Sequence, residues 1–178
     1  YVHQEIKGNV WDIQKVTIKK ESKGMGWGAV YALYEEDMDK IGVQSNVLRV
    51  YKELYRDGKP LAADVPLKIG DKLTVRLTVM ADRDMDFIEI KDERAACMEP
   101  VDVLSGYRWK DGVGFYQRTK DSSTSFYLDK MRKGTYTLQY DVYVNLSGTY
   151  QSGAATIRSV YAPEFNGHEG GISLYVQD

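Results

Sequence analysis

The stretch from Gly134 to Leu146 constrains the fold more than any other part of this chain. Apolar and polar side chains alternate along it with a period of two, which is typical of a β-strand with one buried face. Threonine, tyrosine and valine also suit a pleated, half-buried surface, so composition and period agree. We therefore expect a central strand whose buried face consists of Tyr136, Leu138, Tyr140, Val142 and Val144.

Further strands are predicted on both sides of this one, and no long helical pattern occurs. Asn46 to Arg56 should place Leu48, Val50 and Leu54 on one face, and Leu73 to Val79 alternates as cleanly as the central strand. The other predicted strands are residues 11–19, 27–34, 87–91, 106–109, 113–120, 125–128, 150–157 and 171–176. About nine or ten strands at short spacing predict an all-β fold, an antiparallel sandwich.

The connections between these strands are also predicted. Residues 73–79 and 87–91 should form one hairpin, and residues 113–120 and 125–128 a second one around a polar tip. Residues 92–102 fit a short helical turn or an irregular connection better than a strand, and residues 161–170 are expected to form a loop between the last two strands.

The chain has 178 residues, without an internal repeat or a linker rich in proline or serine. That length is compatible with one domain spanning residues 1–178. Residues 1–20 could instead be a linker or the edge of a preceding domain. Because the sequence starts at Tyr1 and shows no signal peptide, we expect a segment of a longer protein.

Charge and cysteine content exclude several classes of function. A formal net charge of -2 does not indicate the basic surface that binds nucleic acid or an anionic membrane. No apolar run approaches the roughly 20 residues that span a bilayer, so direct membrane insertion is not expected. Cys97 is the only cysteine, which excludes an internal disulfide and a cysteine-based metal site. It is predicted to be a small packed hydrophobe.

No arrangement of residues predicts catalysis, a metal or a cofactor. The acidic series from Asp82 to Asp86, with Glu93, has the spacing of a calcium loop, but Phe87 stands where that loop requires glycine. We expect a polar hairpin tip there instead. His3 and His168 lie in no recognisable nucleophile–base constellation. The sequence thus predicts a binding or structural module and not an enzyme.

Three segments in the C-terminal third carry a family resemblance. They are Gly106-Tyr-Arg-Trp109 with Asp111, Leu128 to Tyr140 with its Lys133-Gly-Thr-Tyr-Thr137, and Tyr161-Ala-Pro-Glu164 followed by Gly167. In order and spacing they resemble the last domain of bacterial alpha-2-macroglobulins, the large broad-spectrum protease traps. Upstream, Leu67 to Val79 and Ile88 to Pro100 are similar to the family more loosely. Two departures are Arg94-Ala-Ala-Cys97 in place of Pro-Ala-Gly, and Val160 in place of a frequent methionine.

The resemblance implies a macroglobulin-like β-sandwich within a periplasmic or cell-envelope protein, often held by a lipoprotein anchor outside this segment. In that family a protease cuts a bait region, and a rearrangement captures it, commonly through a thioester in a separate helical domain. The Cys-x-Glu-Gln motif of the thioester is absent from this chain, so the covalent step would belong elsewhere. The implied partners are the other domains of the same longer chain and, through the whole protein, target proteases.

The resemblance also implies an interdomain interface at Val160, Tyr161, Pro163 and Glu164. In thioester-bearing relatives the residues at the positions of Val160 and Tyr161 lie over the thioester and shield it from water. In the alternative, Tyr161 only packs its loop against the sandwich, with Pro163 fixing the turn. An interface role predicts an exposed Tyr161 ring when the partner is missing.

The competing class is an extracellular adhesive or carbohydrate-binding sandwich. Exposed aromatic side chains stack on sugar rings in such modules, and Tyr107, Trp109 and Tyr116 are the residues that could form a platform here.

Overall fold

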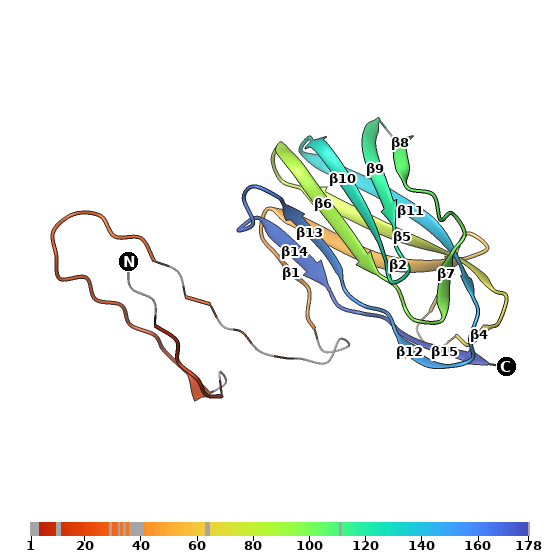
Figure 1. Ribbon diagram of the computed structural model, residues 1–178, viewed down its shortest axis with the longest axis horizontal. Coiled ribbons are helices and arrows are strands. Elements are labelled where there is room, and N and C mark those ends of the chain that lie inside the picture. The colour runs from red at the N-terminus through yellow and green to blue at the C-terminus, as the bar shows by residue number, and fades with distance from the viewer. Residues whose placement is uncertain are drawn as a thin grey trace. The chain divides into compact units, whose positions relative to one another are not determined.

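The computed structural model describes residues 4–9, 12–28, 30–31, 33, 35, 41–62, 65–110 and 112–177. The chain divides into two units, residues 1–36 and residues 37–178. Every strand of the described residues lies in the second unit (Figure 1). Whether the first residues belong to the same domain as the rest stays a prediction.

The described residues of the first unit form no strand. The strands predicted for residues 11–19 and 27–34 are therefore wrong for the positions that can be compared, while Trp11 and Tyr34 lie outside the described residues. Ile18 and Trp27 are exposed, the latter to 91%. A strand needs a neighbour that pairs its backbone and covers its apolar side chains, and alternation alone supplies neither.

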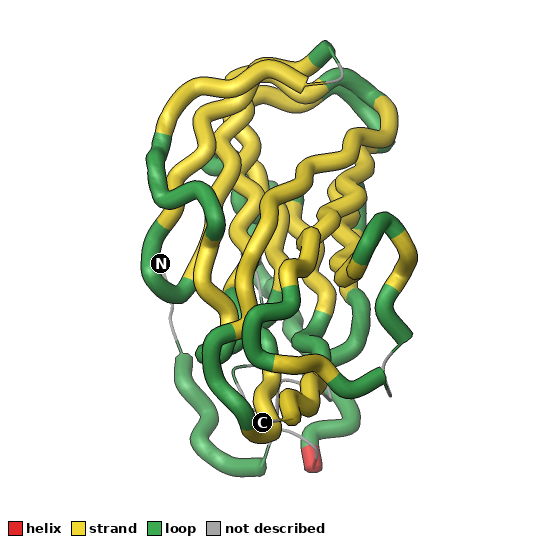
Figure 2. The backbone as a smooth tube through the Cα atoms, turned by 90° about the vertical axis from the view of Figure 1, so that its right-hand side faces the viewer, coloured by secondary structure: helices red, strands yellow, loops and turns green. Residues whose placement is uncertain are grey.

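Three sheets make up the second unit. The seven-stranded sheet has the order β1 (Gln44–Ser45), β14 (Asn166–Glu169), β13 (Ala155–Ser159), β6 (Met85–Glu93), β10 (Ser123–Met131), β9 (Val113–Thr119) and β8 (Gly106–Lys110). The five-stranded sheet has the order β3 (Lys59–Pro60), β2 (Leu48–Arg56), β5 (Lys72–Ala81), β11 (Gly134–Val144) and β7 (Met98–Pro100). The three-stranded sheet is β12 (Gly148–Gln151), β15 (Ser173–Gln177) and β4 (Leu67–Lys68). Figure 2 shows the two larger sheets as facing layers, which confirms the predicted β-sandwich.

β11 is the predicted central strand. It pairs with β5 from Gly134 to Tyr143 and with β7 at Val142–Val144, so neighbours flank it on both sides. Leu138, Tyr140, Val142 and Val144 are buried and Tyr136 is partly buried, whereas the intervening side chains are exposed or half-buried. The predicted face is confirmed.

One of the two predicted hairpins is wrong. β9 and β10 do form an antiparallel hairpin. β5, however, pairs with β2 and β11, whereas β6 pairs with β10 and β13 in the opposite sheet. The short segment 82–84 therefore carries the chain from one sheet to the other, and the predicted hairpin tip does not exist. Alternation fixes which side chains point inward but leaves the partner strand open.

Three connections differ from the prediction. Asp92 and Glu93 end β6, and Met98–Pro100 is the edge strand β7, so only 94–97 and 101–102 of the predicted connection lie outside strands. The predicted strand 150–157 is broken into β12 and β13, which belong to different sheets. The predicted loop 161–170 contains β14, which pairs with β13 and β1. The pairing is antiparallel throughout these sheets except between β15 and β4, which are parallel.

The core lies between the two larger sheets, and its largest fully buried side chains include Phe126, Leu48, Leu77, Ile88, Ile90, Leu128 and Ile157. At one edge the layers come together, because β1 pairs in the seven-stranded sheet and is followed two residues later by β2 of the other. A Cβ on Gly167 of β14 would lie 2.4 Å from the Leu48 carbonyl oxygen, so this crossing requires glycine.

Candidate interdomain interface

The predicted interface residues lie on the loop 160–165, which joins β13 to β14. The Ser159 amide donates to the Phe165 carbonyl at 3.0 Å, and the Phe165 amide donates to the Ala162 carbonyl at 2.9 Å. The Val160 amide donates to the Phe87 carbonyl at 2.9 Å, which ties the loop to β6. Backbone hydrogen bonds thus fix both the turn and its position on the sheet.

Asparagine side chains fix the second half of this loop. Asn46 Nδ2 donates to the Glu164 carbonyl at 2.6 Å, and Asn166 Nδ2 donates to the Pro163 carbonyl at 2.8 Å. The Pro163 and Glu164 side chains remain exposed. The domain therefore satisfies their backbone groups internally and leaves their side chains free to contact something else.

Tyr161 projects from this loop with 77% of its surface exposed. Its ring meets Phe87 edge to face, with centroids 5.0 Å apart and an interplanar angle of 90°. Phe87 and Val160 are exposed as well. We call Phe87, Val160 and Tyr161 the Tyr161 patch. This ring contact lies at the surface, outside the core.

Phe87 is a residue that the sequence prediction missed. Its φ of 53° lies in the left-handed region, which a bulky side chain rarely adopts, and such strain gathers at functional sites. The burial alternation of β6 is interrupted here, with Met85 and Ile88 buried while Phe87 is exposed. The sequence did contain a signal, because in the predicted strand 87–91 the aliphatic Ile88 and Ile90 share one face, which is expected to point inward. An aromatic residue directly before Ile88 then lies on the outer face.

The aromatic residues of the competing prediction lie elsewhere, on the edge strand β8 and its neighbour β9 of the seven-stranded sheet. Tyr107 and Trp109 on β8 are both exposed, and the Tyr107 and Tyr116 rings meet edge to face at 5.1 Å. Trp109 lies over Gly114, where a Cβ would approach its ring to 2.9 Å. The structure therefore does not bring this group together with the Tyr161 patch.

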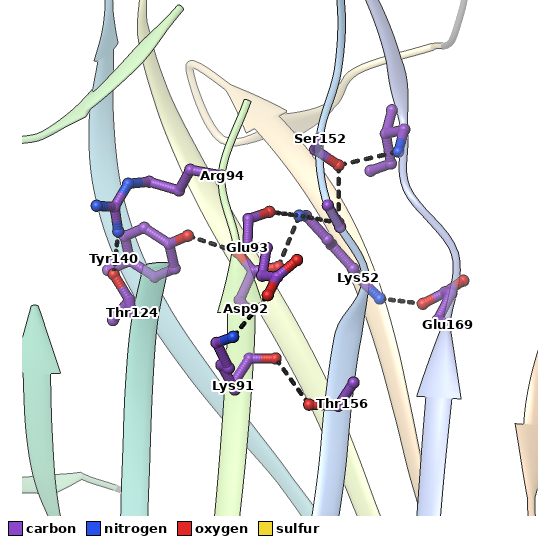
Figure 3. A network of polar contacts seen from close by, with 12 residues as sticks. Lys52, Lys91, Asp92, Glu93, Arg94, Thr124, Tyr140, Ser152, Thr156 and Glu169 are labelled. Carbon is purple, nitrogen blue, oxygen red and sulfur yellow. Dashed lines mark hydrogen bonds and ion pairs between the residues drawn. The ribbon is translucent and has the colours of Figure 1, made fainter. Parts of the chain in front are cut away.

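A buried polar network is the second feature that the sequence prediction missed (Figure 3). Lys52 on β2 and Asp92 on β6 reach each other across the core, with Nζ 2.6 Å from Oδ1 and side chains only 2% and 0% exposed. Lys52 is in phase with Val50 and Leu54, and Asp92 is in phase with Ile90, so each points inward among apolar residues. That phase was readable from the sequence.

Tyr140 and Arg94 complete the network. The Tyr140 hydroxyl on β11 donates to Asp92 Oδ2 at 2.5 Å, and Arg94 donates to Thr124 Oγ1 at 2.6 Å. Burial raises the pKa of Asp92 above its usual range, against the opposing effects of Lys52, Tyr140 and Arg94. Burial and the nearby Asp92 charge raise the pKa of Tyr140 well above its ordinary value. One carboxyl group of the seven-stranded sheet thus contacts a cation and a hydroxyl donor from the five-stranded sheet.

Among the residues that the structure describes, the thiol and the possible metal ligands form no further site. Cys97 is buried, and desolvation raises the pKa of its thiol, which disfavours the nucleophilic thiolate. Within the described ranges, no three His, Cys, Asp or Glu side chains gather in a way that could hold a metal ion. No helix of the described chain is long and apolar enough to span a membrane.

Comparison with known proteins gives a consistent family. The model of the bacterial alpha-2-macroglobulin MG10 domain matches residues 46–164. An alpha-2-macroglobulin homolog of Nostoc sp. is 27% identical over 147 residues, which is 76% of this chain and 7% of the homolog. The chain therefore spans a small part of that relative.

Solved structures agree in fold. The Salmonella alpha-2-macroglobulin reacted with methylamine matches 78% of this chain, and 10% of its own chain, with a TM-score of 0.64 at 23% identity. The Escherichia coli alpha-2-macroglobulin activated by porcine elastase matches 78% of this chain, and 14% of its own, with a TM-score of 0.66 at 19% identity. Since the domain model covers more than half of the sequence, this chain belongs to the family of bacterial alpha-2-macroglobulin MG10 domains.

Proposed function

We propose that this chain works as one domain of an endopeptidase trap, and that the Tyr161 patch packs on a neighbouring, thioester-type domain of the same protein. The observation that carries the proposal is the exposed Tyr161 ring on a loop that hydrogen bonds fix from both ends. Aromatic anchors on a preorganised surface are typical of protein interfaces, because their burial gains contact area at little entropic cost.

The length of the relatives supports a partner within the same chain. The matched segment is 7% of the Nostoc homolog and 10% of the Salmonella chain, so most of each relative's chain lies outside this fold. The whole protein would be periplasmic or attached to the cell envelope, and its target proteases would meet it there. The domain itself would catalyse no reaction.

Shielding from water is the role that the patch suits chemically. An activated acyl group persists only where water is excluded, and an aromatic ring on a fixed loop can exclude it. The Salmonella relative has been crystallised after reaction with methylamine, a small amine nucleophile. If the full protein carries a thioester, the rings of Tyr161 and Phe87 would limit access to it until a protease triggers rearrangement.

The test is the Tyr161→Ala variant of the full-length protein. We expect faster methylamine incorporation and thiol release in a thioester-bearing protein, or otherwise a shift of the native conformer toward the protease-treated form in native gels. Tyr175→Ala is the matched control, because Tyr175 is an exposed tyrosine on a different sheet. Identical behaviour of the two variants in both assays would contradict a role of Tyr161 in the interface.

Carbohydrate binding remains the second candidate function, favoured by the exposed Tyr107 and Trp109 on an edge strand. An exposed aromatic side chain can present the apolar face of its ring to a sugar. A glycan array with the chain and its Trp109→Ala variant decides this candidate. Binding that depends on Trp109 would establish it, and an empty array would dismiss it.

A further inference from the structure

We propose that Lys52 and Asp92 condense to an intramolecular isopeptide bond that joins the two sheets covalently. The two side chains come from opposite layers, β2 and β6, and both are almost fully buried. They are held with Nζ 2.6 Å from Oδ1, so the reacting groups are already in contact within the folded chain. In well-oriented intramolecular reactions, the effective concentration of one reacting group at the other is on the order of 10⁵–10⁸ M.

The surroundings of Lys52 Nζ orient the nitrogen for attack. Two backbone carbonyls accept from it, Glu93 at 2.9 Å and Gly153 at 3.2 Å. A neutral amine has two hydrogens and one lone pair. If the hydrogens are directed at these two carbonyls, the lone pair is left for Asp92. Consistent with this, Asp92 Oδ1 accepts no hydrogen bond of normal geometry although the Lys52 nitrogen lies beside it.

The surroundings of Asp92 make its carboxyl group a better electrophile. The Tyr140 hydroxyl donates to Oδ2 at 2.5 Å and withdraws electron density from the carboxyl carbon (Figure 3). Burial raises the pKa of Asp92, which favours the carboxylic acid over the carboxylate. The condensation joins that carboxylic acid to the amine form of Lys52.

The step balances without a co-reactant. Lys52 Nζ attacks Asp92 Cγ, the N–C bond forms, one C–O bond breaks, and the departing oxygen leaves as water with the acid proton and one amine proton. The remaining carbonyl oxygen keeps the hydrogen bond from Tyr140. The remaining amide hydrogen can still be donated to Glu93 or Gly153. The charged pair in the core is replaced by a neutral amide whose polar atoms all retain partners.

Intact-mass spectrometry of the folded 178-residue chain tests the proposal. The expected mass is lower than the sequence mass by one water. Trypsin should then yield residues 50–56 uncut after Lys52 and carrying residues 92–94, with fragment ions that place the link between Lys52 and Asp92. Tyr140→Phe should slow its formation in freshly refolded protein, because the donor to Oδ2 is lost.

The control is Lys52→Arg, which keeps a cation beside Asp92 but offers a guanidinium that does not condense. Its mass should equal its sequence mass. Aspartate can also lose water by cyclising on its own backbone, as at Asp57-Gly58, and that loss would persist in Lys52→Arg. A full sequence mass for the wild type after prolonged incubation, or a water loss that the control shares, would overturn the proposal.

Discussion

Ile18 in the first unit and Leu138 in the second are aliphatic residues in segments that the sequence predicts as strands, yet 72% of the Ile18 surface and 2% of the Leu138 surface is exposed. Leu138 lies on β11, where β5 pairs along almost its whole length. Among the described residues of the first unit, no strand is present to pair with the segment around Ile18. The difference shows that the sequence pattern determines which side chains share a face. Their burial also requires a neighbouring strand.

The same contrast applies to charged residues. Lys52 and Asp92 share the phase of buried aliphatic residues, and the sandwich covers them as completely as it covers Leu138. Lys19 and Glu21 in the first unit also pair, at 3.2 Å, but both side chains are largely exposed. Burial therefore makes one pair consequential for stability, while solvent screens the other.

The largest effect is expected for Asp92→Ala, because it leaves the buried Lys52 charge without its counter-ion and the buried Tyr140 hydroxyl without its acceptor. The free energy of unfolding should fall by about 3–5 kcal/mol, measured by urea denaturation. Asp86→Ala is the matched control, since Asp86 is an exposed carboxylate on the same strand and should change stability by less than about 0.5 kcal/mol. Equal effects of the two variants would show that the network contributes nothing.

A second experiment compares the two units directly. Leu138→Ala should lower the free energy of unfolding by about 2–5 kcal/mol, because it removes a buried side chain and leaves a cavity. Ile18→Ala removes a side chain that is already in water, and its effect should stay below about 0.5 kcal/mol. The measurement is again urea denaturation of the 178-residue chain. A loss for Leu138→Ala as small as that for Ile18→Ala would refute its place in the core.

The residues in these two experiments also show which parts of the fold could be predicted from the sequence. β11 and the β9–β10 hairpin were predictable, because Leu138 and Val142 repeat with period two and a short polar tip joins β9 to β10. The crossing from β5 to β6 was not, since Val79 and Ile88 point inward whichever sheet receives them. The partners of Asp92 were equally hidden. Its inward phase could be read locally, but Lys52 and Tyr140 approach it only when the two sheets face each other.

The candidate interface also contains residues that the sequence could predict and one that it could not. Tyr161 and Pro163 could be singled out from the sequence through a family resemblance. The contribution of Phe87 depends on a positive φ and on a hydrogen bond from Val160, both of which arise from the tertiary structure. Whether the patch contacts another domain stays a prediction that the full-length protein must answer.

A smaller effect is expected for Tyr140→Phe, which keeps the ring but removes the donor to Asp92 Oδ2. The lost hydrogen bond leaves a buried acceptor unsatisfied, so the free energy of unfolding should fall by about 1–3 kcal/mol. Tyr143→Phe is the control on the same strand, because Tyr143 points to the exposed face. If the two substitutions lower the free energy of unfolding equally, the hydrogen bond from Tyr140 to Asp92 is not important for stability.

The smallest effect concerns the outward face of the same strand, where Asp141 accepts from Thr74 Oγ1 at 2.7 Å and pairs with Lys72 at 2.8 Å. Partial burial raises the pKa of Asp141, but hydrogen bonds from Lys72 and Thr74 and the Lys72 charge outweigh it, so the pKa lies below its ordinary value of 3.8. A carboxyl group whose pKa is lowered by folding stabilises the fold above its unfolded pKa, and that stabilisation is lost as the pH falls through the folded pKa. The wild type should therefore exceed Asp141→Asn slightly in thermal stability at pH 7, and the difference should shrink as the pH falls below about 4 and vanish below the folded pKa. Because both charged partners are substantially exposed, salt should also shrink the difference at pH 7. A difference that grows on acidification would contradict the assigned sign.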